Sequence, residues 1–242
     1  MSADVLVTSF APDAAEAYGN RGTVSMWNRW PQWLSLYLDA PLPWTPPSGA
    51  RHLTGEIVGW PETRRRLPVS NPDAAKPTNY IWNARKYAVK VFVWCDAAER
   101  LASMSSACVT WLDADTVTHA QVPYDFSRSL LGDAAVAYLG RGAMHPETGF
   151  VAFRIPDALP LLRWMRDAYR DGTYAQWTDG WTDCHALRHG LAAVPVKAAD
   201  LTSHAYDGEW RSTVDAFALS PLAPYVRHLK GQQAKREAAC VI

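Results

Sequence analysis

Two aspartates separated by one residue follow a nearly continuous apolar segment near the middle of the chain. The segment 107–112 (ACVTWL) has the pattern of a strand that is buried on both faces of a sheet. Ligands of open α/β sheets bind just outside the carboxyl ends of strands, which is where Asp113 and Asp115 stand. Residues two apart in an extended chain point the same way, so the two carboxylates repel each other and raise each other's pKa. A divalent cation removes that cost by accepting oxygen ligands, and we therefore predict a Mg²⁺ or Mn²⁺ site that also holds a diphosphate.

The elements that must position these aspartates can be read from the apolar patterns. Strands are predicted at 5–10, 34–38, 107–112, 134–139 and 149–155, and helices at 11–20, 80–101, 157–170 and 179–191. The helix over 80–101 has the clearest pattern, because its apolar residues recur at three- and four-residue steps. Strands that alternate with helices indicate an α/β fold with a parallel or mixed sheet.

Composition excludes several classes of protein. The 24 basic and 24 acidic residues give a net charge of zero, which argues against a broad basic surface for nucleic acid. No apolar run approaches the roughly 18 residues of a membrane helix, and the start of the chain lacks the basic region of a signal peptide. We expect reduced thiols in a cytoplasmic protein, because no C-x-x-C pair occurs among the four cysteines, Cys95, Cys108, Cys184 and Cys240.

The segment Leu112-Asp113-Ala114-Asp115-Thr116 resembles the D-x-D motif of GT-A glycosyltransferases, which use nucleotide-sugar donors. Other segments agree in order with small glycosyltransferases, many of them encoded by phages: 6–10 (LVTSF), 83–92 (NARKYAVKVF), 139–141 (LGR) with 147–150 (ETGF), and 228–231 (HLKG). Within the second of these, Asn83 stands where the resemblance predicts an acidic residue.

The resemblance covers about residues 5–231 and implies an α/β fold of the GT-A type, with a Rossmann-like mixed central sheet flanked by helices. It implies a single domain over residues 1–242. A nucleotide-sugar-binding half would cover about 1–118 and an acceptor-binding half about 119–231, followed by a tail at 232–242.

The chemistry of glycosyl transfer gives the metal a role. The transition state is oxocarbenium-like, and negative charge grows on the departing diphosphate. A Mn²⁺ or Mg²⁺ ion held by Asp113 and Asp115 would neutralise that charge, with Asp115 as the more direct ligand and Asp113 contacting the ribose, or the metal through water. By resemblance His228 completes the metal site, a position that suits an imidazole.

Further residues are expected to bind a nucleotide-sugar donor, with a UDP-sugar as the first candidate. The resemblance places the nucleotide base at the end of the first strand, at Thr8, Ser9 and Phe10. Lys230, in the late His-containing motif, and Lys90 are candidate cations for the phosphates, although each is equally suited to a solvated surface.

Two carboxylates are candidates for the group that deprotonates the acceptor hydroxyl. We favour Asp183, in the segment GWTDCH, as the residue nearest the reacting sugar, and assign Glu147 to contact with the acceptor or the donor sugar. The alternatives are a carboxylate at a helix N-terminus for Asp183 and a turn residue for Glu147. If Asp183 acts as a nucleophile, the reaction retains configuration, so the stereochemical outcome stays open.

The acceptor is expected to contact Trp181, whose ring could stack on a sugar, and Arg141, in the acceptor-side segment. The phage resemblance suggests a hydroxymethylated pyrimidine in DNA, modified in the host cytoplasm and flipped out of the duplex. A local basic groove for DNA would draw on Arg64–Arg66, Arg141, Arg163, Arg166 and Arg170. A polysaccharide or protein hydroxyl remains open, and the oligomeric state is not predicted.

Two rival functions fit a pair of aspartates at a strand end. Nucleotidyltransferases and phosphohydrolases also use such pairs, but they usually carry a glycine-rich basic loop after the first strand, where this chain has Ala11-Pro12-Asp13. The other rival is a module that binds sugars or nucleotides without turnover.

Overall fold

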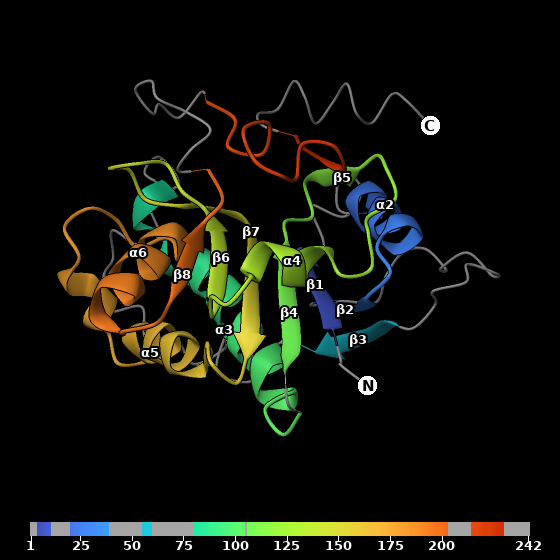
Figure 1. The fold of residues 1–242 in the computed structure, drawn as a ribbon. Helices are drawn as coiled ribbons and strands as arrows, with labels where there is room; N and C mark the ends of the chain where they lie inside the picture. Colours follow the sequence, from blue (N-terminus) through green and yellow to red (C-terminus); the bar gives the residue numbers. More distant parts are fainter. Residues whose placement is uncertain are drawn as a thin grey trace.

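The computed structural model describes residues 4–10, 20–38, 55–59, 80–104, 106–202 and 214–229. Its centre is a seven-stranded sheet in the order β3-β2-β1-β4-β7-β6-β8 (Figure 1). The strands are β1 (Asp4–Phe10), β2 (Trp33–Leu38), β3 (Gly55–Gly59), β4 (Ala107–Leu112), β6 (Val136–Leu139), β7 (Glu147–Ile155) and β8 (Ala198–Asp200). Only β7 runs antiparallel to its neighbours, β4 and β6, so the described sheet is mixed, as predicted.

Strand β4 lies in the middle of this sheet, between β1 and β7. All six of its residues are buried, which confirms the prediction of a strand covered on both faces. Alternate side chains enter two separate hydrophobic cores: Val109 and Trp111 lie in one, and Cys108 and Leu112 lie in the other.

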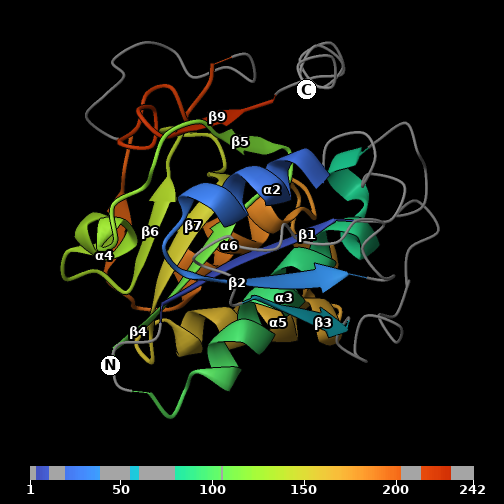
Figure 2. The same ribbon diagram turned by 90° about the vertical axis from the view of Figure 1, so that its right-hand side faces the viewer.

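Helices cover both faces of the sheet (Figure 2). One face carries α3 (Ala84–Arg100), α5 (Leu159–Arg170) and α6 (Asp183–Ala193), which pack on one another as well as on the sheet. The opposite face carries α2 (Asn20–Arg29), α4 (Phe126–Leu131) and a small two-stranded sheet of β5 (Thr116–Thr118) and β9 (Val226–His228). Two short 3-10 helices, η4 (Tyr80–Trp82) and η5 (Thr173–Gln176), complete the described elements.

Two predicted helices are shorter than expected, for identifiable reasons. The helix predicted over 80–101 divides into η4 and α3 because Asn83 caps α3, its side chain accepting a hydrogen bond from the backbone N–H of Lys86 at 3.0 Å. The helix predicted from residue 179 begins only at Asp183. Gly180 has a φ of +142°, a conformation that a helix cannot continue through.

The sequence patterns did not reveal several elements. They are α2, β3, α4, β5, β8 and β9. Four of these six are strands of five residues or fewer, too short to display a periodic pattern. The helix predicted over 11–20 lies almost wholly outside the described residues, as do the tail and Cys240.

The described cysteines, Cys95, Cys108 and Cys184, are free thiols, as predicted. Burial raises the pKa of each to about 12, so they are poor nucleophiles. Within the described part of the chain, no helix combines the length and the apolar character needed to cross a bilayer.

Candidate metal centre and active site

Three neighbouring strands of the sheet have their polar ends on the same side of it, where the strands stop or start. β1 and β4 are parallel and finish there, and β7 begins there because it runs the opposite way. The backbone N–H of Asp113 donates to the carbonyl oxygen of Gly149 at 2.8 Å, so the last ladder contact of β4 reaches the first aspartate. The sheet therefore places the start of β7 beside the aspartate pair.

The aspartates lie in a tight turn between β4 and β5. The backbone N–H and the hydroxyl of Thr116 both donate to the carbonyl oxygen of Asp113, at 3.0 and 2.6 Å. The carbonyl oxygen of Asp115 accepts from the backbone N–H of Leu229 at 2.9 Å. These contacts fix the backbone of both acidic residues, so their carboxylates project from a rigid support.

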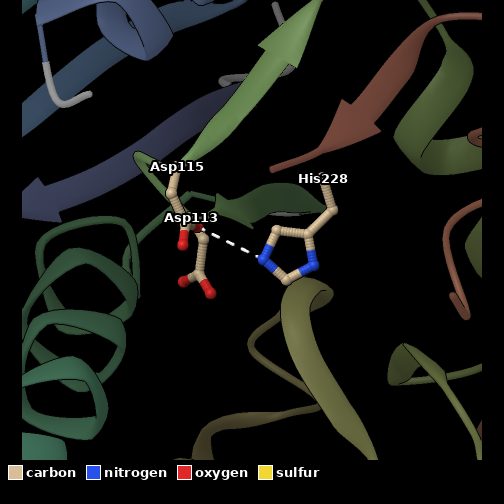
Figure 3. Close-up of side chains that lie close together, drawn as sticks. All are labelled: Asp113, Asp115 and His228. Carbon is tan, nitrogen blue, oxygen red and sulfur yellow. Dashed lines mark ion pairs between the residues drawn. The ribbon is translucent and has the colours of Figure 1, made fainter. Parts of the chain in front are cut away.

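His228 reaches the aspartates through the small sheet. β5 and β9 are antiparallel, and Thr116 pairs with His228 in their register. The imidazole Nε2 lies 3.3 Å from Oδ1 of Asp115 (Figure 3). One possible ligand atom from each of Asp113, Asp115 and His228 lies within 4.8 Å of the other two. The structure therefore brings together the three residues predicted to bind metal.

The chemistry of this group suits a divalent cation. Carboxylate oxygens with one imidazole nitrogen match the ligands of Mn²⁺, and the carboxylates match those of Mg²⁺. Burial raises the pKa of Asp113, and the nearby charges of Asp115 and Asp183 raise it further against the opposing effect of Lys90. Burial alone would lower the pKa of His228, but its hydrogen bond to Asp115 and the charge of that carboxylate raise it. Three carboxylates close to a single lysine leave an excess of negative charge, and this excess favours a bound cation.

Lys90 of α3 connects this group to Asp183. Its ammonium Nζ lies 2.7 Å from Oδ1 of Asp113 and 2.9 Å from Oδ2 of Asp183, and all three side chains are largely buried. Burial alone would lower the pKa of Lys90, but the two carboxylates raise it above its usual value. Lys90 was predicted as a candidate cation for the phosphates, which stays a prediction; in the structure its ammonium bridges two carboxylates.

Two residues at this site were missed by the sequence reasoning. The indole N–H of Trp111 donates to Oδ1 of Asp113 at 2.7 Å. The sequence signal for this contact was the two-residue spacing of Trp111 and Asp113, because residues two apart on a strand point the same way. The hydroxyl of Thr148 donates to Asp183, lies 3.3 Å from Nζ of Lys90, and contacts Sγ of Cys184 at 3.1 Å. No sequence signal links Thr148 to α6.

The start of β7 and the preceding loop are tied together. Oε1 of Glu147 accepts from the backbone N–H of Gly149 at 3.2 Å, and the other carboxylate oxygen lies 3.6 Å from Arg141. Arg141 is 6% exposed and donates to the carbonyl oxygens of His145 and Pro146. The prediction that Arg141 contacts the acceptor is therefore not supported, because its guanidinium is buried and holds the loop.

Trp181 also differs from its prediction. Its side chain is 5% exposed, packs edge-on against Trp82 and Tyr174, and donates its indole N–H to the carbonyl oxygen of Trp177. A ring packed in this way offers no open face to a sugar, so Trp181 belongs to the hydrophobic core.

The residues predicted to bind the nucleotide base end strand β1. Thr8 is fully buried, and its hydroxyl has no hydrogen-bond partner among the described residues, so it is not placed to touch a ligand. Ser9 is half-buried and stays a candidate, as does Phe10, the last residue of β1. Lys230 lies outside the described residues.

The arginines predicted to form a basic groove are engaged elsewhere. Arg163 and Arg166 pair with Glu99, and Arg170 pairs with Asp167 and Asp171. These ion pairs compensate the charges of the α5 arginines and therefore do not support a basic groove there. Arg64–Arg66 lie outside the described residues.

Comparisons with known proteins bear on the fold. No protein-family model and no curated protein sequence matches the chain. Among solved structures, the chain resembles the galactosyltransferase LgtC in complex with donor and acceptor sugar analogues. The TM-score is 0.58, over 97% of this chain and 95% of that one, with 11% sequence identity. With its central mixed sheet flanked by helices, the chain has the GT-A glycosyltransferase fold.

Proposed function

We propose that the protein is a metal-dependent glycosyltransferase that moves a sugar from a nucleotide-sugar donor, a UDP-sugar as first candidate, to an acceptor hydroxyl. The observation that carries this proposal is the convergence of Asp113, Asp115 and His228 at the edge of the sheet where ligands bind in α/β folds. The similar galactosyltransferase was solved with donor and acceptor sugar analogues, which adds support.

Asp113, Asp115 and His228 are the residues that would hold a Mn²⁺ or Mg²⁺ ion. When bound, such an ion supplies positive charge next to the departing diphosphate. The rigid turn and the β5–β9 pairing hold the three side chains close together before any ligand arrives, which reduces the reorganisation needed on binding.

Asp183 is our candidate for the residue that faces the reacting sugar. The hydroxyl of Thr148 donates to its carboxylate, and the ammonium of Lys90 lies 2.9 Å away, so the carboxylate is oriented from two sides. Glu147, held by the backbone of Gly149, is the candidate for contact with the acceptor or the donor sugar. Lys90 orients both Asp113 and Asp183, and Lys230 and Ser9 stay candidates for donor contacts.

The acceptor is proposed only as a hydroxyl. Hydroxymethylated DNA, a polysaccharide and a protein hydroxyl are the three candidates to test. The described residues weigh against DNA, because the arginines of α5 are paired with carboxylates and Arg141 is buried. A transfer assay with hydroxymethyl-containing DNA, with unmodified DNA as the control, decides this case by a mass shift of the DNA.

The proposal is tested by screening nucleotide sugars with the purified protein and Mn²⁺ and measuring nucleotide release. We expect release with at least one donor, and a loss of about two orders of magnitude or more in Asp115→Ala, because one ligand of a charge-stabilising ion is gone. Asp157→Asn, which changes an exposed carboxylate in the turn between β7 and α5, should release nucleotide at the wild-type rate.

Three results would contradict the proposal. Wild-type activity in Asp115→Ala would exclude the metal site. Pyrophosphate release from nucleoside triphosphates, with no sugar transfer, would favour a nucleotidyltransferase. Donor binding without hydrolysis or transfer, across all three acceptor classes, would favour a binding module.

A further inference from the structure

Helix α2 lies directly against the turn that carries the two aspartates. A Cβ atom placed on Gly22 would lie 2.0 Å from the carbonyl oxygen of Ala114 and 2.9 Å from that of Thr116. Both contacts are with backbone, which cannot rotate away as a side chain can. Only a residue without a side chain fits at position 22 while the turn keeps its present course.

Ala114 is the residue between the two aspartates. A shift of its peptide group would therefore move Asp113 and Asp115 together. Thr116 closes the turn by donating to the carbonyl oxygen of Asp113, and the backbone N–H of Leu229 anchors the turn to a second segment by donating to the carbonyl oxygen of Asp115, so both contacts oppose a shift of the turn away from α2. Steric pressure at Gly22 would be relieved by distorting the peptides that orient the two carboxylates.

The same helix also supports the third candidate ligand. The hydroxyl of Ser25 donates to the carbonyl oxygen of Gly22 and accepts from the backbone N–H of Thr118, at 2.7 and 3.0 Å. Directly after the end of α2, the indole N–H of Trp30 donates to the hydroxyl of Thr118 at 3.0 Å. Thr118 belongs to β5, whose pairing with β9 brings in His228 (Figure 2). Contacts from α2 therefore reach the peptide between the two aspartates and the strand that pairs with the strand of His228.

We propose that Gly22 is a positioning residue for the metal centre, because it lets α2 pack directly on the peptide between Asp113 and Asp115. The inference rests on the proposed metal site and adds a residue that neither binds metal nor faces substrate. The contact sets the spacing of the aspartates, so a side chain at position 22 weakens metal binding more than it weakens the fold.

The test measures Mn²⁺ affinity directly, from the free Mn²⁺ signal in electron paramagnetic resonance, together with the melting temperature without metal. We expect Gly22→Ala to bind Mn²⁺ at least about 10-fold more weakly than wild type, the size of loss seen when support around metal ligands is removed.

Gly190→Ala is the matched control. Gly190 is also a helical glycine in close contact, but its Cβ would meet the side chains of Leu161 and Met165 in α5. The Gly190→Ala variant should change the melting temperature and leave Mn²⁺ affinity at the wild-type value.

A second variant covers the case in which Gly22→Ala does not fold. Ser25→Ala keeps the shape of α2 and removes one hydroxyl, a loss that the fold should tolerate. We expect a smaller loss of Mn²⁺ affinity, about 3-fold or more. Wild-type affinity in folded Gly22→Ala, or in Ser25→Ala when the first variant is unfolded, would overturn the inference.

Failure of the proposed function looks different. If wild-type protein binds no Mn²⁺, or binds it equally well after Asp115→Ala, the metal site itself is wrong. If wild type binds Mn²⁺, Asp115→Ala does not, and Gly22→Ala binds like wild type, the metal site stands and only the role of Gly22 fails.

Discussion

Asp113 uses its two carboxylate oxygens differently. Oδ1 accepts the indole N–H of Trp111 and faces the ammonium of Lys90, both at 2.7 Å. Oδ2 is therefore the oxygen that we expect to meet a cation. Because Asp113 already accepts from two donors on the protein, we still expect Asp115 to be the more direct ligand.

Replacing Trp111 by Phe tests this arrangement. The variant keeps an aromatic ring in the core and removes the N–H that orients Asp113. We expect Mn²⁺ affinity to fall about 10-fold, as for other losses of a group that orients a metal ligand. Isothermal titration calorimetry with Mn²⁺ measures it.

Trp94→Phe is the matched control for this change. Trp94 lies next to Trp111 in the same core, and its indole N–H has no hydrogen-bond partner in the described part of the chain. It should cost similar stability and leave Mn²⁺ affinity unchanged. Equal affinities in the two variants would show that the Trp111 hydrogen bond does not orient the ligand.

At the scale of elements, the loop 140–146 joins β6 to β7 and packs against α6. The rings of His145 and His185 lie 4.4 Å apart, and the hydroxyl of Thr182 is 2.8 Å from Nδ1 of His185. Burial, together with the positive charges of Arg141 and His185, lowers the pKa of His145 to about 4, and Glu147 and Asp179 oppose this only in part. Burial also lowers the pKa of His185. The contact between loop and helix therefore favours neutral histidines.

The stability of the protein should consequently fall with pH below the ordinary histidine pKa. A histidine with a lowered pKa in the folded state is protonated first in the unfolded chain, so stability decreases as the pH falls from about 6.5 towards 4. We expect His145→Asn to show a smaller drop in melting temperature between pH 7 and pH 5 than wild type. His119→Asn, which changes an exposed histidine, should retain the wild-type drop. An identical drop in all three proteins would contradict the role assigned to His145.

At the scale of the whole molecule, the sheet separates two hydrophobic cores, and the candidate metal centre lies at the carboxyl end of β4, beside both. β4 and β7 contribute alternate residues to each core, so the strands that carry the site are also its rigid support. Strands from before and after residue 118, where the two halves were predicted to divide, pair in the same seven-stranded sheet. That division into donor and acceptor halves stays a prediction.

Phe153 offers a test of this support. It lies on β7, is fully buried, and packs against Trp94 of α3 with ring centroids 5.4 Å apart. We expect Phe153→Ala to lower the free energy of unfolding by about 3–5 kcal/mol, measured by chemical denaturation, because the cavity cannot close within a packed core. Met104→Ala, at a residue 47% exposed, should change it by less than about 0.5 kcal/mol. Similar losses in both variants would contradict the packing described for this face.

Sequence patterns recovered much of the fold because those patterns are local. The apolar run at 107–112, followed by acids two residues apart, predicted both strand β4 and the position of the candidate metal ligands at its end. The stripe of α5 and the apolar strand β7 were found in the same way. Short elements such as β5 and β9 have too few residues to show a period, so the pairing that brings in His228 could not be predicted from patterns.

The order of residue types along the chain was therefore sufficient for the mixed α/β sheet, the position of the aspartate pair and the free thiols. Tertiary structure decided which side chains meet: Lys90 bridges two carboxylates, Trp181 is buried, Arg141 holds a loop, and Gly22 allows α2 to reach the turn. The physical reason is that burial pattern and turn chemistry act over a few residues. Contacts between distant segments depend instead on how helices and strands pack together in three dimensions.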